Sequence, residues 1–291
     1  MAEGAPIAAV VVNFNAGELL VRSASALLAA PEVSRLEVFD NASTDDSLDQ
    51  LSRKHADTPK LHVTRNEENI GFASAVNRCA QRVDEEHLLV VNPDCVLEPG
   101  AVGTLLGAIS EDPGAALAGP CVIGEKGDPE RSNLRQLPRP WTSFMSLSGL
   151  WRLSGSFPMM RGIAVDTHHV VQAVRAEAVS GACMLIRRDV LAQVGDFDEH
   201  YGLHCEDLDL MARLADAGWH CLYVPSAIAH HWQGTSSRSR PLWVHWQKHR
   251  GMARYFRKFQ AGRHAWPVRA MVQVGIWSAF LLRLPWVWIR S

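Results

Sequence analysis

The chain lacks any closely spaced pair of cysteines. Its six cysteines lie far apart and none belongs to a Cys-x-x-Cys pair, which excludes a zinc ribbon and a disulfide framework. Residues 1–6 also lack the charged and apolar stretches of a signal peptide. We find no apolar run of the roughly 18 residues that a membrane-spanning helix needs. These absences predict a reduced protein that is made and kept in the cytoplasm.

Acidic residues are missing from residues 217–291, which contain eleven Lys or Arg. Within 241–291, six tryptophans alternate with these cations. We therefore divide the chain into residues 1–237 and a helical, basic and Trp-rich appendage, 238–291. The appendage has two interpretations: a helix on the anionic inner face of the cell membrane, or a helical pair packed on the rest of the protein. No RNA-binding motif accompanies these residues, so no nucleic-acid partner is expected.

The first third of the chain alternates between two patterns. Apolar, β-branched runs occur at residues 7–12, 36–39, 61–64 and 88–91. Helical periodicity or helix-capping residues follow the first three, at 19–28, from 41–46 onward and at 69–79. Strands that are apolar throughout and joined by helices are typical of a parallel sheet covered on both faces. The sequence therefore predicts an α/β fold.

The rest of the chain is less regular. We expect a helix over 101–109, a strand over 115–123 and a strand over 179–186. A helix over 206–217 and a strand over 219–224 should follow. The segment between them, residues 124–170, is rich in Pro, Gly, Ser and Arg and has no clear period. We interpret it as a long excursion that includes an acceptor-facing lid.

Polar side chains stand where the predicted strands end. The run Leu88–Val91 passes directly into Asn92-Pro93-Asp94, so a rigid turn holds a carboxylate at the end of a buried strand. Asn-Pro-Asp alone is an ordinary turn. In an open α/β sheet, however, ligands bind at the carboxyl edge of the strands, so a row of such residues predicts a nucleotide pocket. The row comprises Asn13, Asp40, Asn69, Asn92 and Asp94.

Seven segments, in one order and at one spacing, resemble the family 2 inverting glycosyltransferases, and most closely their bacterial rhamnosyltransferase-like branch. They are VVNFN (11–15), DNASTDDS (40–47), NIGFASAVN (69–77), NPDC (92–95), SGACMLIRRDVLAQVGDFDE (180–199), CEDLDLMARLADAGW (205–219) and HHWQGTS (230–236). The resemblance implies a GT-A fold, which is a Rossmann-like nucleotide-diphospho-sugar transferase fold with a mixed central sheet. It also implies a nucleotide-sugar donor and a divalent cation, Mg²⁺ or Mn²⁺.

The resemblance implies metal ligands. Asp94 matches the second acid of the family's Asp-x-Asp metal motif, but Asn92 replaces the first acid, which predicts weaker metal binding. His231 has the spacing of the family's metal- or diphosphate-contacting histidine, ahead of Gly234 and Ser236. Neighbouring side chains on an extended segment point opposite ways, so only one of His230 and His231 faces the site.

The resemblance also implies a catalytic base. Asp207 would take the proton of the attacking acceptor hydroxyl, and Glu206 is the second candidate. The structural alternative for this acidic pair is helix capping, because carboxylates favour a helix N-terminus. The donor would lie along the sheet edge, with a glycine under its sugar where a side chain would block the ring. The predicted donor-binding residues are Asn13, Asn15, Asp40, Asn69, Gly71, Asn92, Asp94 and Gly181.

The sequence thus predicts an inverting glycosyltransferase for cell-surface glycan synthesis, such as O-antigen, lipopolysaccharide or cell wall. The candidate donor is dTDP-L-rhamnose, and the acceptor is a lipid-linked glycan or a polysaccharide. One alternative is a sugar-phosphate nucleotidyltransferase, but the loop after the first strand is not Gly-rich and basic. Another is a catalytically silent membrane-docking protein, which the Asn92 replacement favours. The first strand is not followed by Gly-x-Gly-x-x-Gly, which argues against a dehydrogenase.

Overall fold

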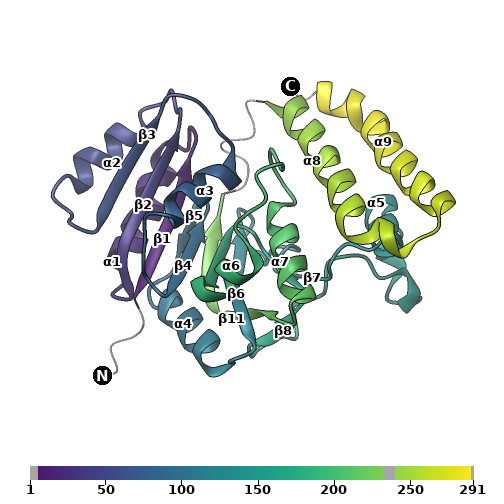
Figure 1. The fold of residues 1–291 in the computed structure, drawn as a ribbon, viewed down its shortest axis with the longest axis horizontal. Helices are drawn as coiled ribbons and strands as arrows, with labels where there is room; N and C mark the ends of the chain where they lie inside the picture. Colours follow the sequence, from purple (N-terminus) through teal and green to yellow (C-terminus); the bar gives the residue numbers. More distant parts are fainter. Residues whose placement is uncertain (1–5, 233–239, 290–291) are drawn as a thin grey trace.

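A computed structural model describes residues 6–232 and 240–289, arranged as Figure 1 shows. A mixed sheet runs through the molecule in the order β3-β2-β1-β4-β10-β6-β11-β5, and β8 pairs with β11. The first four are parallel, and β10 is antiparallel to both β4 and β6. The strands are β1 (Ile7–Asn13), β2 (Val33–Asn41), β3 (Leu61–Asn66), β4 (His87–Val91), β5 (Cys95–Leu97), β6 (Ala115–Gly124), β7 (Leu134–Arg135), β8 (Val174–Ala176), β9 (Ala178–Val179), β10 (Cys183–Arg187) and β11 (His220–His231).

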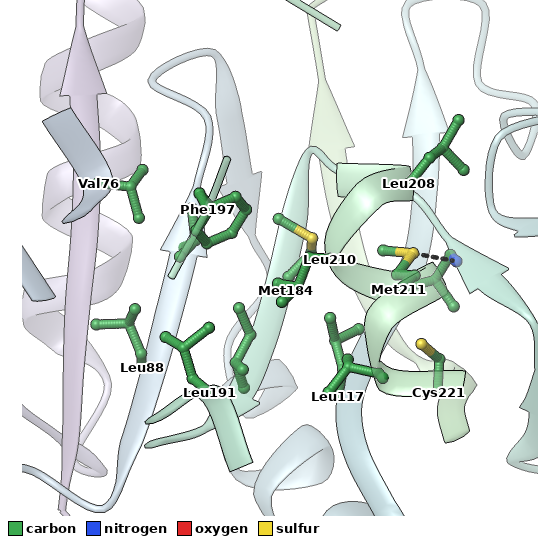
Figure 2. Close-up of a cluster of buried hydrophobic side chains, with 14 of the residues drawn as sticks. Val76, Leu88, Leu117, Met184, Leu191, Phe197, Leu208, Leu210, Met211 and Cys221 are labelled. Atoms are coloured by element: carbon green, nitrogen blue, oxygen red, sulfur yellow. Dashed lines mark hydrogen bonds between the residues drawn. The ribbon is translucent and has the colours of Figure 1, made fainter. Parts of the chain in front are cut away.

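Helices cover both faces of the sheet. Side chains of α1, α2 and α4 form one hydrophobic cluster with the sheet, and those of α3, α6 and α7 form the other. Figure 2 shows the second cluster, where Met211 and Leu210 of α7 lie near Met184 and Leu117 of the sheet. The helices are α1 (Glu18–Ala29), α2 (Ser47–His55), α3 (Phe72–Ala80), α4 (Ala101–Glu111), α5 (Pro140–Ser148), α6 (Arg188–Val194), α7 (Glu206–Asp216), α8 (Pro241–Tyr255) and α9 (Trp266–Ile289), with short turns η1 (Leu150–Leu153), η2 (Pro158–Met160), η3 (Phe256–Gln260) and η4 (Ala261–Arg263).

The two clusters explain the apolar strands. Along β1, Ala8 and Val10 belong to one cluster whereas Ala9 and Val11 belong to the other, and all four are fully buried. Because both faces of the strand are covered, no position is left for a polar side chain. The predicted α/β fold with a mixed sheet is confirmed.

Two predicted strands have different bounds in the structure. The strand expected over 179–186 is split into β9 and β10 by Ser180-Gly181-Ala182. The strand expected to end at residue 224 continues to His231. Pro225 cannot donate to a ladder, and the strand passes it through a register shift between Val224 and Ile228.

The segment 124–170, for which no periodicity was found, contains β7, α5 and two helical turns. Its strand β7 pairs with β9 in a small second sheet. Both strands are only two residues long, so neither leaves a repeating pattern in the sequence. The excursion therefore leaves the sheet and returns to it beside Ser180.

The C-terminal helices lie at the end of the molecule opposite α2 (Figure 1). Lys258 Nζ is 2.7 Å from Asp209 of α7, and Arg254 is 2.8 Å from Asp198. Beyond this anchored part, Trp266–Trp288 is long and apolar enough to cross a membrane. The mean hydropathy of its most apolar 18 residues is 1.3, and 6% of that stretch is buried. The expectation that no such stretch exists is wrong, because Arg269 and Arg283 interrupt a run that is apolar on average. The predicted boundary at 237/238 lies outside the described residues.

Candidate active site

Asp94 lies at the predicted edge of the sheet, just after β4. The N–H of Asn92 donates to the carbonyl of Ala182 at 2.9 Å, which fixes the turn against the start of β10. Trp232 donates its N–H to the carbonyl of Asp94 at 3.0 Å, so the end of β11 lies beside the same turn. The Asp94 residue is buried, with 6% of its surface exposed. This position brings together two segments that are far apart in the sequence.

His231 lies between two carboxylates. Its Nε2 is 3.2 Å from Asp94 Oδ1 and its Nδ1 is 2.9 Å from Glu130 Oε1. Burial lowers the pKa of this imidazole, but the hydrogen bonds to Asp94 and Glu130 outweigh burial and raise the pKa to about 9. A hollow of about 460 Å³ opens beside it, lined among others by Glu98, Gly124 and Trp232.

His230 has a different partner, although it lines the same hollow as His231. Its Nε2 is 2.7 Å from Glu98 Oε1, and the His230 side chain is 41% exposed whereas that of His231 is 10% exposed. The alternation along β11 therefore gives the two histidines different partners, as expected for an extended segment.

The residues around His231 would suit a divalent cation once Nε2 has lost its proton, because only a neutral imidazole nitrogen binds a metal. Two ligands bound at right angles to one cation at about 2.1 Å are about 3 Å apart, and Asp94 Oδ1 and His231 Nε2 are 3.2 Å apart. The Asn92 amide is 3.5 Å from the same nitrogen, and Glu130 on Nδ1 would orient the ring as an outer carboxylate does in metal sites. No group of three or more His, Cys, Asp or Glu side chains within the described ranges could hold a metal ion. Other ligands would have to come from the donor or water.

The acidic pair Glu206-Asp207 begins α7. Asp207 Oδ2 is 2.8 Å from Arg135 Nη2, and the Asp207 side chain is 18% exposed. Glu206 is buried, and its Oε2 has no hydrogen-bond partner. Burial, followed by the charge of Asp207, raises the pKa of Glu206 to about 8. At neutral pH Glu206 is therefore protonated, whereas Asp207 is the partly exposed member of the pair and contacts Arg135.

Replacing Glu206 with Gln should change how stability depends on pH. The pKa of Glu206 is about 8 in the folded protein against 4.5 for the free group. The contribution of Glu206 to the free energy of unfolding is fully present below pH 4.5. As the pH rises to about 8 this contribution is lost, by up to about 1.4 kcal/mol per pH unit. E206Q lacks this titration, so its free energy of unfolding should rise relative to wild type between pH 5 and pH 8. Urea unfolding of both proteins at pH 5 and pH 8 measures this difference. If the free energies of unfolding of wild type and E206Q change equally between the two pH values, Glu206 does not lose its proton in this range.

The loop before α7 is strained. His204 and Cys205 have φ angles of 68° and 74°, in the left-handed region that non-glycine residues avoid. Helix α8 packs against this loop through Gly251, where an added Cβ would lie 2.8 Å from the His204 carbonyl oxygen. The C-terminal helix therefore helps to hold the loop that presents Asp207.

Gly251→Ala should damage activity and stability together. The methyl group would push on backbone that cannot move cheaply, so we expect the melting temperature to fall by several degrees, equivalent to about 1–3 kcal/mol. We also expect kcat to fall at least tenfold. Gly275→Ala in α9 is the matched control, because nothing lies within 4 Å of its Cβ position. Equal behaviour of the two variants in calorimetry and turnover would exclude the bracing role.

Hydrogen-bonded backbone connects Asp94 with Asp207. Asn92, two residues before Asp94, is bonded to Ala182, and a Cβ on the adjacent Gly181 would lie 2.8 Å from Asp207 Oδ2. A second connection runs through the excursion, where Glu130 contacts His231 and Arg135 contacts Asp207. The two predicted carboxylates are therefore connected through the same two stretches of chain, and Gly181 leaves room for Asp207.

The polar residues after β1 and β2 form a network. Asn13 Nδ2 donates to Asp40 Oδ1 at 2.8 Å and to Ser47 Oγ at 2.8 Å, and Asn13 is fully buried. Asn15 Oδ1 accepts the N–H of Thr44 at 2.7 Å. Asp40 lines a hollow of about 450 Å³ between this loop and β3. Asn13 and Asn15 thus shape the loop, and Asp40 is the member that faces an open space.

Asn69 and Gly71 also meet at the sheet edge. Asn69 Oδ1 accepts from Asn41 Nδ2 and from the N–H of Gly71, both at 3.0 Å. Gly71 has φ 86°, which a glycine adopts without strain. At this predicted donor-binding residue the backbone N–H is thus already bonded to Asn69.

Sequence reasoning missed Glu130 and Arg135. Both lie in the excursion, where no period or motif distinguishes them from the other charged residues. The N–H of Val122 donates to Asn133 Oδ1 at 2.9 Å, so a fully buried asparagine between them fixes this stretch on β6. Only the folded chain shows that two residues of this short stretch contact His231 and Asp207.

Comparisons with known proteins identify the family of this chain. A family model described as glycosyltransferase like family 2 matches residues 5–254. An N-acetylglucosaminyl-diphospho-decaprenol L-rhamnosyltransferase of Mycobacterium tuberculosis is 32% identical over 240 residues, covering 76% of this chain and 75% of that protein.

Solved structures show the same fold. GalNAc-T7 with UDP, GalNAc and Mn²⁺ superposes with a TM-score of 0.64 at 16% identity, covering 88% of this chain and 48% of that one, so this chain spans about half its length. The mannosyltransferase PcManGT of Pyrobaculum calidifontis with GDP-Man and Mn²⁺ gives 0.60 at 16% identity, covering 99% and 73%. The predicted GT-A fold and glycosyltransferase class are confirmed, and the nucleotidyltransferase alternative is set aside. This chain belongs to the family 2 glycosyltransferases.

Proposed function

We propose that this glycosyltransferase transfers L-rhamnose from dTDP-L-rhamnose to a lipid-linked glycan acceptor, with inversion, in the synthesis of a cell-surface glycan. The observation that carries the proposal is the contact between Asp94 and His231, together with the hydrogen-bonded connection from their turn through Ala182 and Gly181 to Asp207. The choice of donor and acceptor rests on the 32% identical relative, whose name gives an L-rhamnosyl transfer to a lipid-linked diphosphate. The enzyme would work at the cytoplasmic membrane face through residues 241–291.

The reaction is a displacement in which Asp207 takes a proton. The acceptor hydroxyl oxygen forms a bond to the anomeric carbon as the bond from that carbon to the diphosphate oxygen breaks. The hydroxyl proton passes to Asp207, and the nucleoside diphosphate leaves with the bonding electrons. Because Arg135 holds Asp207 Oδ2 at 2.8 Å, the other carboxylate oxygen would take the proton.

The opposite side of the site would bind the diphosphate. Asp94 and His231, with Asn92 beside them, would hold the Mg²⁺ or Mn²⁺ that stabilises negative charge on the leaving phosphates. Asp40 would contact the nucleoside from its hollow after β2, where Asn13 fixes its orientation. Asn15 and Asn69 would support the same edge, as parts of the loops around it.

A donor screen tests the proposal. Full-length protein is heated with Mg²⁺ and each of dTDP-rhamnose, UDP-sugars and GDP-sugars. A ligand at one hundred times its Kd adds about 2.7 kcal/mol, so we expect a clear rise in melting temperature with the dTDP-sugar alone. Turnover of that donor should give a glycoside of opposite anomeric configuration by NMR. A product that retains the donor's configuration would contradict the displacement.

A further inference from the structure

The excursion contains a second basic segment without acids. Residues 131–165 include five arginines and no Asp or Glu, which matches the composition of residues 217–291. Two of the arginines stand over one tryptophan, with Arg131 3.4 Å and Arg152 4.9 Å from the Trp151 ring centre. The segment therefore combines cations with aromatic rings.

Large apolar side chains of this segment face solvent. Trp141 and Phe144 are each 53% exposed, Phe157 is 52% and Met159 is 69% exposed. Trp141 donates its ring N–H to the Met159 carbonyl at 2.7 Å and its ring lies 6.1 Å from that of Phe144, so α5 and η2 present these side chains together. A gathered apolar patch of this kind marks an interaction surface.

Helix α9 presents a similar surface. Leu282 is 77% exposed, and Trp286 and Trp288 are 70% and 69% exposed. The inner side of α9 packs on α8, where the rings of Trp277 and Trp246 are 5.2 Å apart. Leu282 and Trp286 therefore remain exposed on α9 although the helix packs on α8.

The two surfaces adjoin each other. Arg283 of α9 donates to the carbonyl of Leu147 in α5 at 3.1 Å, and α5 lies beside the α8–α9 pair in Figure 1. Nearer its start, the excursion contains Arg135, which pairs with Asp207. We call the exposed side chains of residues 141–159 and of α9 the basic–aromatic surface.

We propose that the basic–aromatic surface binds the interface of an anionic lipid bilayer, with the excursion and α9 both in contact with lipid. Interfacial aromatics flanked by arginines without acids fit anionic headgroups. The same positive charge on both partners disfavours a second copy of this chain as the occupant. The role we assign to this lipid binding is to bring a lipid-linked acceptor to Asp207, and that role rests on the proposed function. The lipid binding itself does not depend on the proposed function.

Vesicle binding by the full-length protein tests the proposal. The probes are phosphatidylcholine vesicles with and without phosphatidylglycerol, at low and high salt. We expect wild type to prefer the anionic vesicles and to lose that preference in high salt. The paired variants F144S/F157S and L282S/W286S should each lower the partition coefficient about tenfold, because each removes two interfacial apolar anchors.

Val63→Ser on β3 is the matched control, since Val63 is 40% exposed but lies outside both segments. Unchanged melting temperatures would show that all variants fold. Wild-type-like vesicle binding by F144S/F157S would overturn the proposal, as would binding that ignores anionic lipid. Bound protein that resists alkaline extraction would also overturn it, because α9 would then span the bilayer. The proposal would likewise be overturned if wild type is a dimer that both paired variants dissociate while vesicle binding stays unchanged.

Turnover on a water-soluble acceptor separates this proposal from the proposed function. The paired variants should keep wild-type turnover there, because no substituted side chain contacts Asp94, His231 or Asp207 in the structure. A wild-type protein that binds anionic vesicles but transfers no sugar would sink the proposed function and leave the surface assignment supported.

Discussion

Replacing Asp207 with Asn is expected to lower kcat by about 10³-fold while the Kd for the donor nucleotide stays within about twofold of wild type. A positioned base contributes roughly 10²–10⁴ to a proton-transfer step, and Asn keeps the size of the side chain but cannot accept the proton. Arg135 would still be held, because the amide oxygen can accept its hydrogen bond. Initial rates of transfer and calorimetric titration with dTDP measure the two quantities.

Two controls make the Asp207 result specific. Asp216→Asn repeats the substitution in the same helix on a side chain that is 59% exposed and far along α7, and it should leave kcat unchanged. Glu206→Gln at pH 7 should also have a small effect, because burial keeps Glu206 protonated and the amide mimics that form. A larger loss in E206Q than in D207N would identify Glu206 as the base instead.

The second large effect is expected at Asp94. Asp94→Asn should lower kcat about 10²-fold and raise the Mn²⁺ concentration needed for half-maximal rate, since a neutral amide binds a hard cation more weakly than a carboxylate. EDTA should abolish wild-type transfer, and added Mn²⁺ or Mg²⁺ should restore it. Rates measured across a metal titration give both parameters.

The adjacent histidines supply a matched pair for this prediction. His231→Gln removes the side chain that is 3.2 Å from Asp94 Oδ1 and should shift the metal titration at least tenfold. His230→Gln, one residue away and paired with Glu98, should not shift it. Transfer that is indifferent to EDTA, or identical titrations for the two histidine variants, would argue against a cation at this place.

Much of the fold could be predicted because its strands are covered on both faces. The runs at β1 and β4 are apolar at successive positions, since neighbouring side chains enter different hydrophobic clusters. The helix at α7 has acids in its first turn and a glycine after its end. Such features depend on local sequence, and the structure agrees with them within a few residues.

The parts that could not be predicted depend on distant contacts. Arg135 takes its place through pairing of β7 with β9 and through its bond to Asp207, some 70 residues later. Asn13 carried the signal of a ligand-binding residue, yet it is fully buried and holds Asp40 and Ser47. An asparagine at a strand end looks the same in sequence whether it touches a ligand or a loop.

The C-terminal region illustrates a different limit. A search for uninterrupted apolar residues stops at Arg269 and Arg283, whereas the helix as a whole is apolar on average. Sequence alone left membrane contact and packing as alternatives for residues 241–291. In the structure α8 packs through buried His249 and Tyr255, while α9 keeps an exposed apolar side.

The central claim is that Asp94 and Asp207 act on one donor from opposite sides of its breaking bond. A crystal structure with dTDP-rhamnose and Mn²⁺ tests it most directly, with D207N used to slow turnover and the metal located by anomalous scattering. We predict Mn²⁺ on Asp94 and His231 beside the diphosphate, with residue 207 facing the anomeric carbon from the other side. A donor bound away from Asp94, or residue 207 turned away from the sugar, would contradict the account.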